Sequence, residues 1–485
     1  MRRAFAAVFA LLACTLVALP ATARGFEIGF VDSLFTDPAP QVRAGWLDRA
    51  RASGAQLVRL TVTWSQVAGV SPPGDPADPA DPSYDFTALD AAVRDAAARG
   101  LDVLFTIGGA PTWAEGPDRP GLDQAPPGSW KPDPRAYGDF AAALAGRYSG
   151  TFDPPGSALV LPRVRYFQAL NEPNLSTYLT PQWDGRRPVS PELYRALLNA
   201  FYERVKAVHP DNVVVSAGTA PFGSPPGGYG MRPLEFWQSL LCLGRYPGSL
   251  LPSDCGDPVQ VDVVAHHPIT GRPRSVADRG DITIPELGDL QGMVRAAEAA
   301  GTVVPAGTRP LWVTELWWET DPPDRFAMVT VGQQARWIAE GLYLIWKQGI
   351  DVTILFLIRD QPYQPADPFA SLQSGVYFAC EQADLFPTLQ AGALFACGEP
   401  KPSLQSVRFP FVTERLSPST LTAWGKAPTP GQVTIEHKVG EDWLALSTAP
   451  SGDDGVFETT VEVSGAAELR ARQGGATSLI WRQQG

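Results

Sequence analysis

Metal-ligating side chains are scarce in this sequence. Its 485 residues include five cysteines and four histidines, which are His209, His266, His267 and His437. None of the histidines belongs to an H-E-x-x-H motif, and no two cysteines form a C-x-x-C pair. So few ligands in such spacings argue against a catalytic metal. We therefore expect an activity that uses neither a metal nor another cofactor.

Blocks of basic residues are also missing. Lysine and arginine together number 39 against 51 aspartates and glutamates, which gives a formal net charge of −12. A chain without a basic patch has little to neutralise phosphates, so nucleic acid is not an expected partner. The hydrophobic fraction of 44% lies near the globular average and excludes wholesale disorder.

Long apolar runs are absent after the first twenty residues. Residues 1–23 have the pattern of a signal peptide: two arginines, an apolar run over residues 4–19, and the small-x-small sequence Ala21-Thr22-Ala23. A membrane anchor and a lipid attachment at Cys14 are the alternatives. We expect cleavage, a secreted, extracellular protein, and no membrane insertion once the signal is removed.

Export makes disulfides possible. The mature chain keeps Cys242, Cys255, Cys380 and Cys397, which allow three pairings. We prefer Cys242–Cys255 with Cys380–Cys397, because each of these bonds closes a short loop.

Eight short β-rich runs alternate with segments of helical periodicity. Several runs are almost continuously apolar, as in parallel strands covered on both faces. The runs are 26–31, 57–63, 101–107, 164–170, 213–217, 261–266, 311–316 and 352–358, and the clearest helices are 85–99, 191–209 and 332–348. This alternation predicts a (β/α)8 TIM barrel over residues 24–402. A doubly wound sheet is the alternative, but no G-x-G-x-x-G follows the first run.

The pattern changes near residue 403. Short runs separated by Gly, Pro and Asp turns follow at 420–424, 433–438, 443–447, 456–463, 468–472 and 478–481. They predict a small all-β sandwich of immunoglobulin-like type over residues 403–485. This domain either packs on the barrel or binds polysaccharide, and packing is the simpler expectation.

Two loops of the predicted barrel are long and rich in Pro and Gly, over residues 71–82 and 116–134. In the first, Asp75, Asp78 and Asp81 recur every third residue. A calcium site is one interpretation, but proline follows each aspartate and no bidentate glutamate motif completes the set. A stiff, solvated loop is the favoured interpretation.

Two glutamates stand where strands four and seven end. The sequence Asn171-Glu172-Pro173 follows the fourth run, and Glu315 ends the seventh. The carboxyl ends of barrel strands carry the active site, and strands four and seven lie across the barrel from each other. Retaining hydrolysis of a glycoside needs two carboxyl groups about 5–5.5 Å apart. The pair therefore predicts glycoside chemistry. Alone, each glutamate is also explained by a helix-start carboxylate or a surface ion pair.

In these positions the chain resembles glycoside hydrolase clan A, the retaining TIM-barrel enzymes that include families 5 and 39. The resemblance implies that Glu172 is the general acid/base and Glu315 the nucleophile. It also implies that Asn171 binds the sugar 2-hydroxyl. Arg59, on strand two, matches the arginine that would hold Glu315 ionised.

The chain departs from the clan's pattern at two points. In His267-Pro268-Ile269 the histidine matches a His-x-Tyr motif but Ile269 replaces the tyrosine, and no tryptophan ends strand eight. His267 is either a sugar contact or a rim hydrogen-bond partner. Trp113 and Trp317 are candidate sugar platforms. Arg359 and Asp360 after strand eight suggest a polar subsite.

We therefore expect a secreted retaining O-glycosyl hydrolase that cleaves a β-linked oligo- or polysaccharide by double displacement. A non-catalytic carbohydrate-binding or cell-surface protein on an inactive barrel is the alternative. Transglycosylation would use the same residues with another acceptor. The sequence identifies neither the sugar nor the linkage, nor attack within a chain or at its ends.

Overall fold

The structure is a computed structural model that describes residues 25–157, 159–244, 250–253, 256–321, 329–362, 364, 371–379 and 398–485. The predicted signal peptide, Cys255, Cys380 and Cys397 lie outside these ranges, so the export and disulfide predictions stay predictions. Within the described ranges, no helix combines the length and the apolar character that crossing a bilayer requires.

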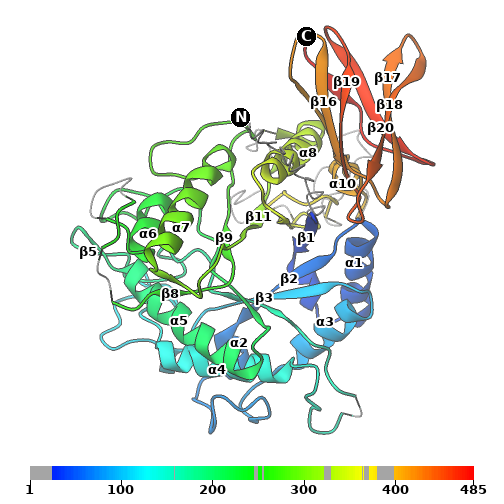
Figure 1. The fold of residues 1–485 in the computed structure, drawn as a ribbon. Helices are drawn as coiled ribbons and strands as arrows, with labels where there is room; N and C mark the ends of the chain where they lie inside the picture. The colour runs from blue at the N-terminus through cyan, green and yellow to red at the C-terminus, as the bar shows by residue number, and fades with distance from the viewer. Residues whose placement is uncertain are drawn as a thin grey trace, which may run out of the picture.

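Eight parallel strands form the barrel (Figure 1). They are β1 (Glu27–Val31), β2 (Leu57–Thr63), β3 (Asp102–Gly108), β4 (Tyr166–Ala169), β7 (Val213–Val215), β9 (Val264–His266), β11 (Leu311–Leu316) and β14 (Val352–Phe356). Their spatial order is β7-β4-β3-β2-β1-β14-β11-β9. The edges β7 and β9 meet through isolated parallel bridges at Val215–Val263 and Thr219–His266. The predicted barrel is confirmed, and each strand falls on one of the eight predicted runs.

Helices surround the sheet on its outer side (Figure 1). They are α1 (Pro40–Ala52), α2 (Trp64–Ala68), α3 (Thr87–Ala97), α4 (Pro134–Arg147), α5 (Ser190–Val208), α6 (Pro233–Leu240), α7 (Leu287–Ala300) and α8 (Val331–Lys347), with 3-10 turns at Ser33–Thr36, Thr112–Ala114 and Ile284–Glu286. The start of α8 is a capping box, in which Thr330 and Gln333 each bond the other's backbone N–H. The three helices predicted from periodicity match α3, α5 and α8 within two residues.

Short strand pairs lie in the loops of the barrel. They are β5 (Trp183–Asp184) with β6 (Arg187–Pro188), β8 (Val259–Gln260) with β10 (Val303–Val304), and β12 (Thr320–Asp321) with β13 (Val329–Thr330).

Two antiparallel sheets follow the barrel. A short helix, α10 (Ser403–Arg408), comes first and packs against α8. The smaller sheet has the order β15 (Phe411–Arg415), β16 (Thr420–Lys426), β19 (Val456–Glu462). The larger contains β18 (Asp442–Ser451), β17 (Gly431–Val439), β20 (Ala467–Gln473) and β21 (Ala476–Thr477), with β22 (Trp481–Gln483) also paired to β20. The predicted all-β region is confirmed, and β15 is a strand that the sequence analysis missed.

The antiparallel region packs on the barrel through a buried tryptophan. Trp424 on β16 is 0% exposed. Its ring centroid lies 6.1 Å from that of Phe26, 5.4 Å from Tyr343 and 5.5 Å from Trp346. Tyr343 and Trp346 belong to α8, so one side chain joins β16 to the barrel's start and to the helix between β11 and β14. This contact supports a packing role for the C-terminal sheets.

The aspartates of the 71–82 loop form consecutive turns. Asp75 Oδ1 accepts the N–H of Ala77, and Asp78 Oδ1 accepts that of Ala80. Asp81 accepts the N–H of Ser83 and, through Oδ2, that of Asp75 at 2.8 Å. The period of three therefore arises from side chains that satisfy their own backbone, which supports the stiff-loop interpretation.

Candidate active site

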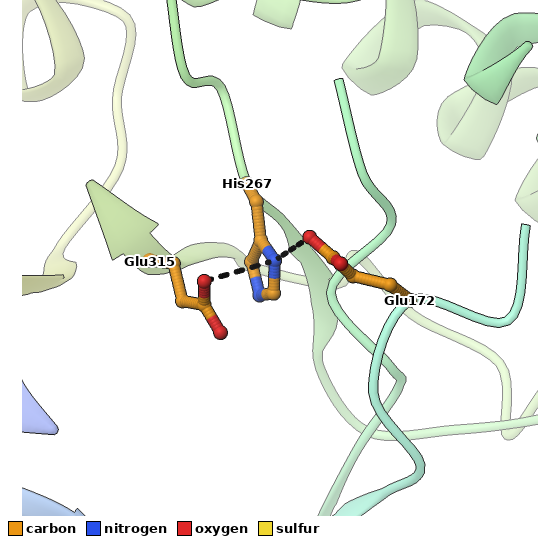
Figure 2. Close-up of side chains that lie close together, drawn as sticks. All are labelled: Glu172, His267 and Glu315. Atoms are coloured by element: carbon orange, nitrogen blue, oxygen red, sulfur yellow. Dashed lines mark hydrogen bonds and ion pairs between the residues drawn. The ribbon is translucent and has the colours of Figure 1, made fainter. Parts of the chain in front are cut away.

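Glu172 and Glu315 face each other at the carboxyl ends of β4 and β11, with His267 between them (Figure 2). One oxygen from each carboxylate and a ring nitrogen of His267 all lie within 4.8 Å of one another. The side chains of Glu172 and Glu315 are 13% and 12% exposed. The two carboxyl groups that the sequence places 143 residues apart therefore meet in one nearly buried site.

The backbone that delivers Glu172 is strained. Leu170 and Glu172 have φ values of 71° and 36°, a left-handed region that costs a non-glycine residue about 1–3 kcal/mol. The conformation is held because Leu170 donates its N–H to Ile107 O at 2.9 Å and Glu172 donates its N–H to Gly218 O at 3.0 Å. These bonds tie the end of β4 to the neighbouring strands β3 and β7.

Asn174 fixes the loop that follows Glu172. Its buried amide donates to Ala220 O and Met231 O, both at 3.1 Å, and accepts the N–H of Ala220 at 2.9 Å. The loop after β4 is thereby held against the loop after β7. A side chain at Gly230 would meet Asn174 O at 2.8 Å, so the close approach of these loops requires glycine there.

Arg59 lies beneath the pair and is 2% exposed. Its Nη1 donates to Glu315 Oε1 at 2.6 Å, and its Nη2 donates to Asn171 Oδ1 at 2.6 Å. The permanent guanidinium charge stabilises Glu315 as the carboxylate and fixes the Asn171 amide with its NH2 group turned outward. Three residues chosen from the sequence are thus in direct contact.

His267 bridges the two carboxylates. Its Nδ1 lies 2.8 Å from Glu172 Oε1 and 3.7 Å from Glu315 Oε2, and its Nε2 lies 3.0 Å from Thr314 Oγ1. The ring is fully buried, so its contacts are with side chains of the site. The neighbouring His266 holds the barrel rim instead, with Nδ1 2.7 Å from Thr219 Oγ1 and Nε2 2.8 Å from Ile282 O.

Glu172 has the electrostatic setting of an acid. Burial raises the pKa of its carboxyl above the usual glutamate value, and the charge of Glu315 adds to this rise. The hydrogen bond from His267 and the charge of Arg59 act in the opposite direction. Because burial dominates, Glu172 keeps its proton to a higher pH than an exposed glutamate, while Arg59 stabilises the charge on Glu315.

The predicted aromatic platforms occupy different places. Trp317 directly follows β11 and is half-buried, with its ring 6.5 Å from that of Phe356 on β14. Trp113 is also half-buried, but its ring meets Trp64 edge-on at 5.6 Å and packs against the core. The structure brings Trp317 to the strand that bears Glu315, whereas the contacts of Trp113 are those of a packing residue.

The suggested polar subsite after β14 is wrong. Asp360 forms a fully buried ion pair with Lys401, 2.7 Å from Oδ1 to Nζ. Arg359 extends towards α1, where its guanidinium lies 5.5 Å from the centre of the Trp46 ring. The Asp360–Lys401 pair holds the β14 loop, because a charge this deeply buried needs a partner. Arg359 is only partly buried and contacts an aromatic ring.

Two tyrosines near the pair escaped the sequence analysis. Tyr178 is half-buried and hydrogen-bonds the Asn171 side chain; burial and then the charges of Glu172 and Glu315 raise the pKa of its phenol. Tyr229 is 60% exposed and accepts two hydrogen bonds from Ser176 at its carbonyl. Tyr178 places a hydroxyl near both carboxylates, where Ile269 does not. A tyrosine five residues after the end of Asn-Glu-Pro is the signal that could have found it.

The donor atoms of Glu172, His267 and Glu315 are close enough to share a cation, and they form such a group within the described ranges. The fit is poor, because Glu315 already bonds the guanidinium of Arg59 at 2.6 Å. A second positive charge beside Arg59 would be repelled. The arrangement suits proton transfer between buried groups better than metal binding.

Of the comparisons with known proteins, the one with solved structures finds a similar fold. No family model matches the chain, and no curated protein matches its sequence. A solved family 39 glycoside hydrolase from the gut symbiont Bacteroides cellulosilyticus WH2 superposes with a TM-score of 0.52 at 16% identity, covering 91% of this chain and 79% of that one. At this identity the likeness shows a shared fold and nothing more.

Two further solved structures give lower scores, from which we draw nothing. They are a glucosidase from Croceicoccus marinus (TM-score 0.49, 14% identity, 93% of this chain and 96% of that one) and a family 39 enzyme from Xanthomonas axonopodis pv. citri (0.48, 13%, 90% and 92%).

Proposed function

We propose that this protein is a retaining O-glycosyl hydrolase that acts on a β-linked glycan outside the cell. One observation carries the proposal: two carboxyl groups from opposite sides of a barrel approach within 4.8 Å. This gap fits direct attack by one carboxylate, whereas an inverting enzyme separates its carboxyl groups by about 6.5–9.5 Å to admit water between them. Export rests on the pattern of residues 1–23.

In the first step an oxygen of the Glu315 carboxylate attacks the anomeric carbon. As the bond from that carbon to the leaving oxygen breaks, the leaving oxygen takes the proton of Glu172. Arg59 supports this step because its guanidinium contacts Glu315 Oε1 at 2.6 Å and places a positive charge beside the attacking oxygen. The raised pKa of Glu172 supports it because the acid must hold its proton at the pH of reaction.

In the second step water attacks the anomeric carbon of the glycosyl ester. Glu172, now a carboxylate, takes a proton from that water while the ester bond to Glu315 breaks. The sugar leaves with its original configuration, and both glutamates return to their starting states. Asn171 is held through its oxygen by Arg59, and its NH2 group, which bonds Tyr178, has a second hydrogen to donate to a sugar hydroxyl.

A panel of aryl β-glycosides and β-linked polysaccharides tests the proposal. We expect Glu315→Ala to lose turnover, and Glu172→Ala to lose it on poor leaving groups but recover part of it with azide on an activated aryl glycoside. Glu192→Ala is the matched control, because Glu192 is an exposed glutamate on α5 that pairs with Arg187.

Undiminished hydrolysis by Glu315→Ala would overturn the proposal. Binding of a glycan without any hydrolysis by the wild type would instead favour the non-catalytic alternative.

A further inference from the structure

A chain of buried polar side chains crosses the barrel beneath the two glutamates. Arg59 Nε lies 2.7 Å from Thr106 Oγ1, and Thr106 Oγ1 lies 2.7 Å from Gln168 Oε1. Gln168 Nε2 lies 3.2 Å from Thr314 Oγ1, which lies 3.0 Å from His267 Nε2. All five side chains are at most 2% exposed. They connect the arginine beneath Glu315 with the histidine beside Glu172.

The direction of each hydrogen bond follows from what the groups can donate. A guanidinium has no acceptor, so Arg59 donates to Thr106, whose own hydrogen is left for Gln168 Oε1. The amide of Gln168 cannot be reversed, because its Nε2 also donates to Ser216 O at 2.9 Å and an oxygen there would face another oxygen. Gln168 therefore donates to Thr314.

The hydroxyl of Thr314 has one hydrogen. Since it accepts from Gln168, that hydrogen is directed to its remaining near partner, His267 Nε2. An imidazole nitrogen that accepts carries no proton, so the neutral ring must carry its proton on Nδ1. Nδ1–H then donates to Glu172 Oε1 at 2.8 Å.

We propose that this buried relay fixes His267 as the neutral Nδ1–H tautomer and thereby directs the acid proton of Glu172 to Oε2. Glu172 Oε1 already accepts the hydrogen bond from His267 Nδ1 and is a poor site for the acid proton. The other carboxyl oxygen, Oε2, therefore carries that proton. Thr314, Gln168 and Thr106 are then positioning residues, which act on the acid through His267. The catalytic part of this inference rests on the proposed function; the tautomer does not.

Two features of the surroundings support the relay. Gly218 leaves the space it needs, because a Cβ there would lie 2.0 Å from His267 Nε2 and 2.6 Å from Thr314 Oγ1. His266 has the opposite arrangement: its Nε2 faces Ile282 O, which can only accept, so its proton is on Nε2 and Thr219 donates to Nδ1. Two adjacent histidines thus hold opposite tautomers, that of His266 set by Ile282 O and that of His267 by Thr314.

Nitrogen NMR of the full chain with 15N-labelled histidine tests the tautomer directly. The chain has four histidines, and His209→Gln and His437→Gln would assign the two that lie away from the site. At neutral pH we expect His267 to show a protonated Nδ1 and a bare Nε2, and His266 the reverse. A His267 ring protonated at Nε2, or at both nitrogens, would overturn the inference whatever the enzyme's activity.

Kinetics of Thr314→Val and Thr314→Ser test the consequence. Valine keeps the shape and removes the hydroxyl, so His267 loses its fixed tautomer and acid catalysis weakens. We expect kcat to fall about tenfold on a glycoside with a poor leaving group, a fraction of the 10²–10⁴ that general acids supply. It should change little on an activated aryl glycoside, with KM unchanged on both.

Serine should restore both the NMR pattern and kcat. An equal loss of kcat on both leaving groups would show that Thr314 supports the fold rather than the acid, and would refute its positioning role. If the wild type hydrolyses no glycoside, the proposed function fails, and the NMR experiment still tests the tautomer by itself.

Discussion

Replacing Gly218 by alanine perturbs the site by a single carbon. Because ordinary Cβ contacts begin near 3.4 Å, the atom at 2.0 Å, His267 Nε2, must move by about 1.4 Å, and Thr314 Oγ1 at 2.6 Å must also yield. Neither neighbour is the end of a flexible side chain, since both are fully buried. Overpacking of this kind costs about 1–3 kcal/mol of folding stability.

The effect of Gly218→Ala on activity should exceed its effect on stability. A shift of about 1 Å in a catalytic group can cost about 10²-fold in rate, and the displaced ring is the one that bonds Glu172. We therefore expect kcat on a glycoside with a poor leaving group to fall about 100-fold while the protein stays folded, as urea titration would show.

Gly45→Ala is the matched control. Gly45 lies inside α1, and a Cβ there meets nothing within 4 Å. Alanine should therefore stabilise the helix by about 0.5–1 kcal/mol and leave kcat unchanged. Wild-type kcat in Gly218→Ala would refute the claim that the His267 position matters to the acid.

Three further outcomes are expected from the structure. Burial raises the pKa of Asp32 to about 6 against a usual value of 3.8. Since the folded state then binds more protons, the free energy of unfolding should fall as pH rises from 4 to 6, by about 2 kcal/mol from this group. Urea titrations across that range should show a shallower fall in Asp32→Asn, and parallel curves would contradict the assignment. Trp424→Ala removes the ring between β16 and α8, and calorimetry should report a loss of about 3–5 kcal/mol; a variant as stable as wild type would show that the sheets do not support the barrel. The raised pKa of Glu172 predicts that kcat/KM declines on the alkaline side, above the usual glutamate range, and that Glu172→Gln abolishes this limb; a limb that persists in the variant belongs to another group.

The barrel could be predicted because each strand has a recognisable local sequence pattern. Runs such as 213–217 and 352–358 are almost continuously apolar, which is the composition of a strand buried on both faces. Strand β15 was missed because only Phe409 and Pro410 separate it from α10. Its place is set by pairing with β16, from Phe411 with Gly425 to Arg415 with Leu421, which a local pattern does not reveal.

The approach of Glu172 to Glu315 followed from strand order, whereas the contacts of Arg59 with Glu315 and Asn171 were expected from the resemblance to clan A. Groups at the ends of known strands converge whatever the loops do. Loop residues were harder to place. Tyr178 reaches the site and Trp113 packs on Trp64, and the only local signal that separates them is that Tyr178 follows Asn-Glu-Pro closely in the sequence. The polar subsite expected at Arg359 and Asp360 was wrong because the partners of these residues, Trp46 and Lys401, lie far away in the chain.

Trapping of the glycosyl ester is the most direct test of the central claim. A 2-deoxy-2-fluoro glycoside with an activated leaving group, built on the best sugar from the substrate panel, slows both steps and lets the ester accumulate. Mass spectrometry of the digested protein should then find the sugar on the peptide that contains Glu315, with the same label absent from Glu315→Gln. A label on Glu172 or on a residue outside the pair, or a hydrolysis product of inverted configuration, would contradict the account.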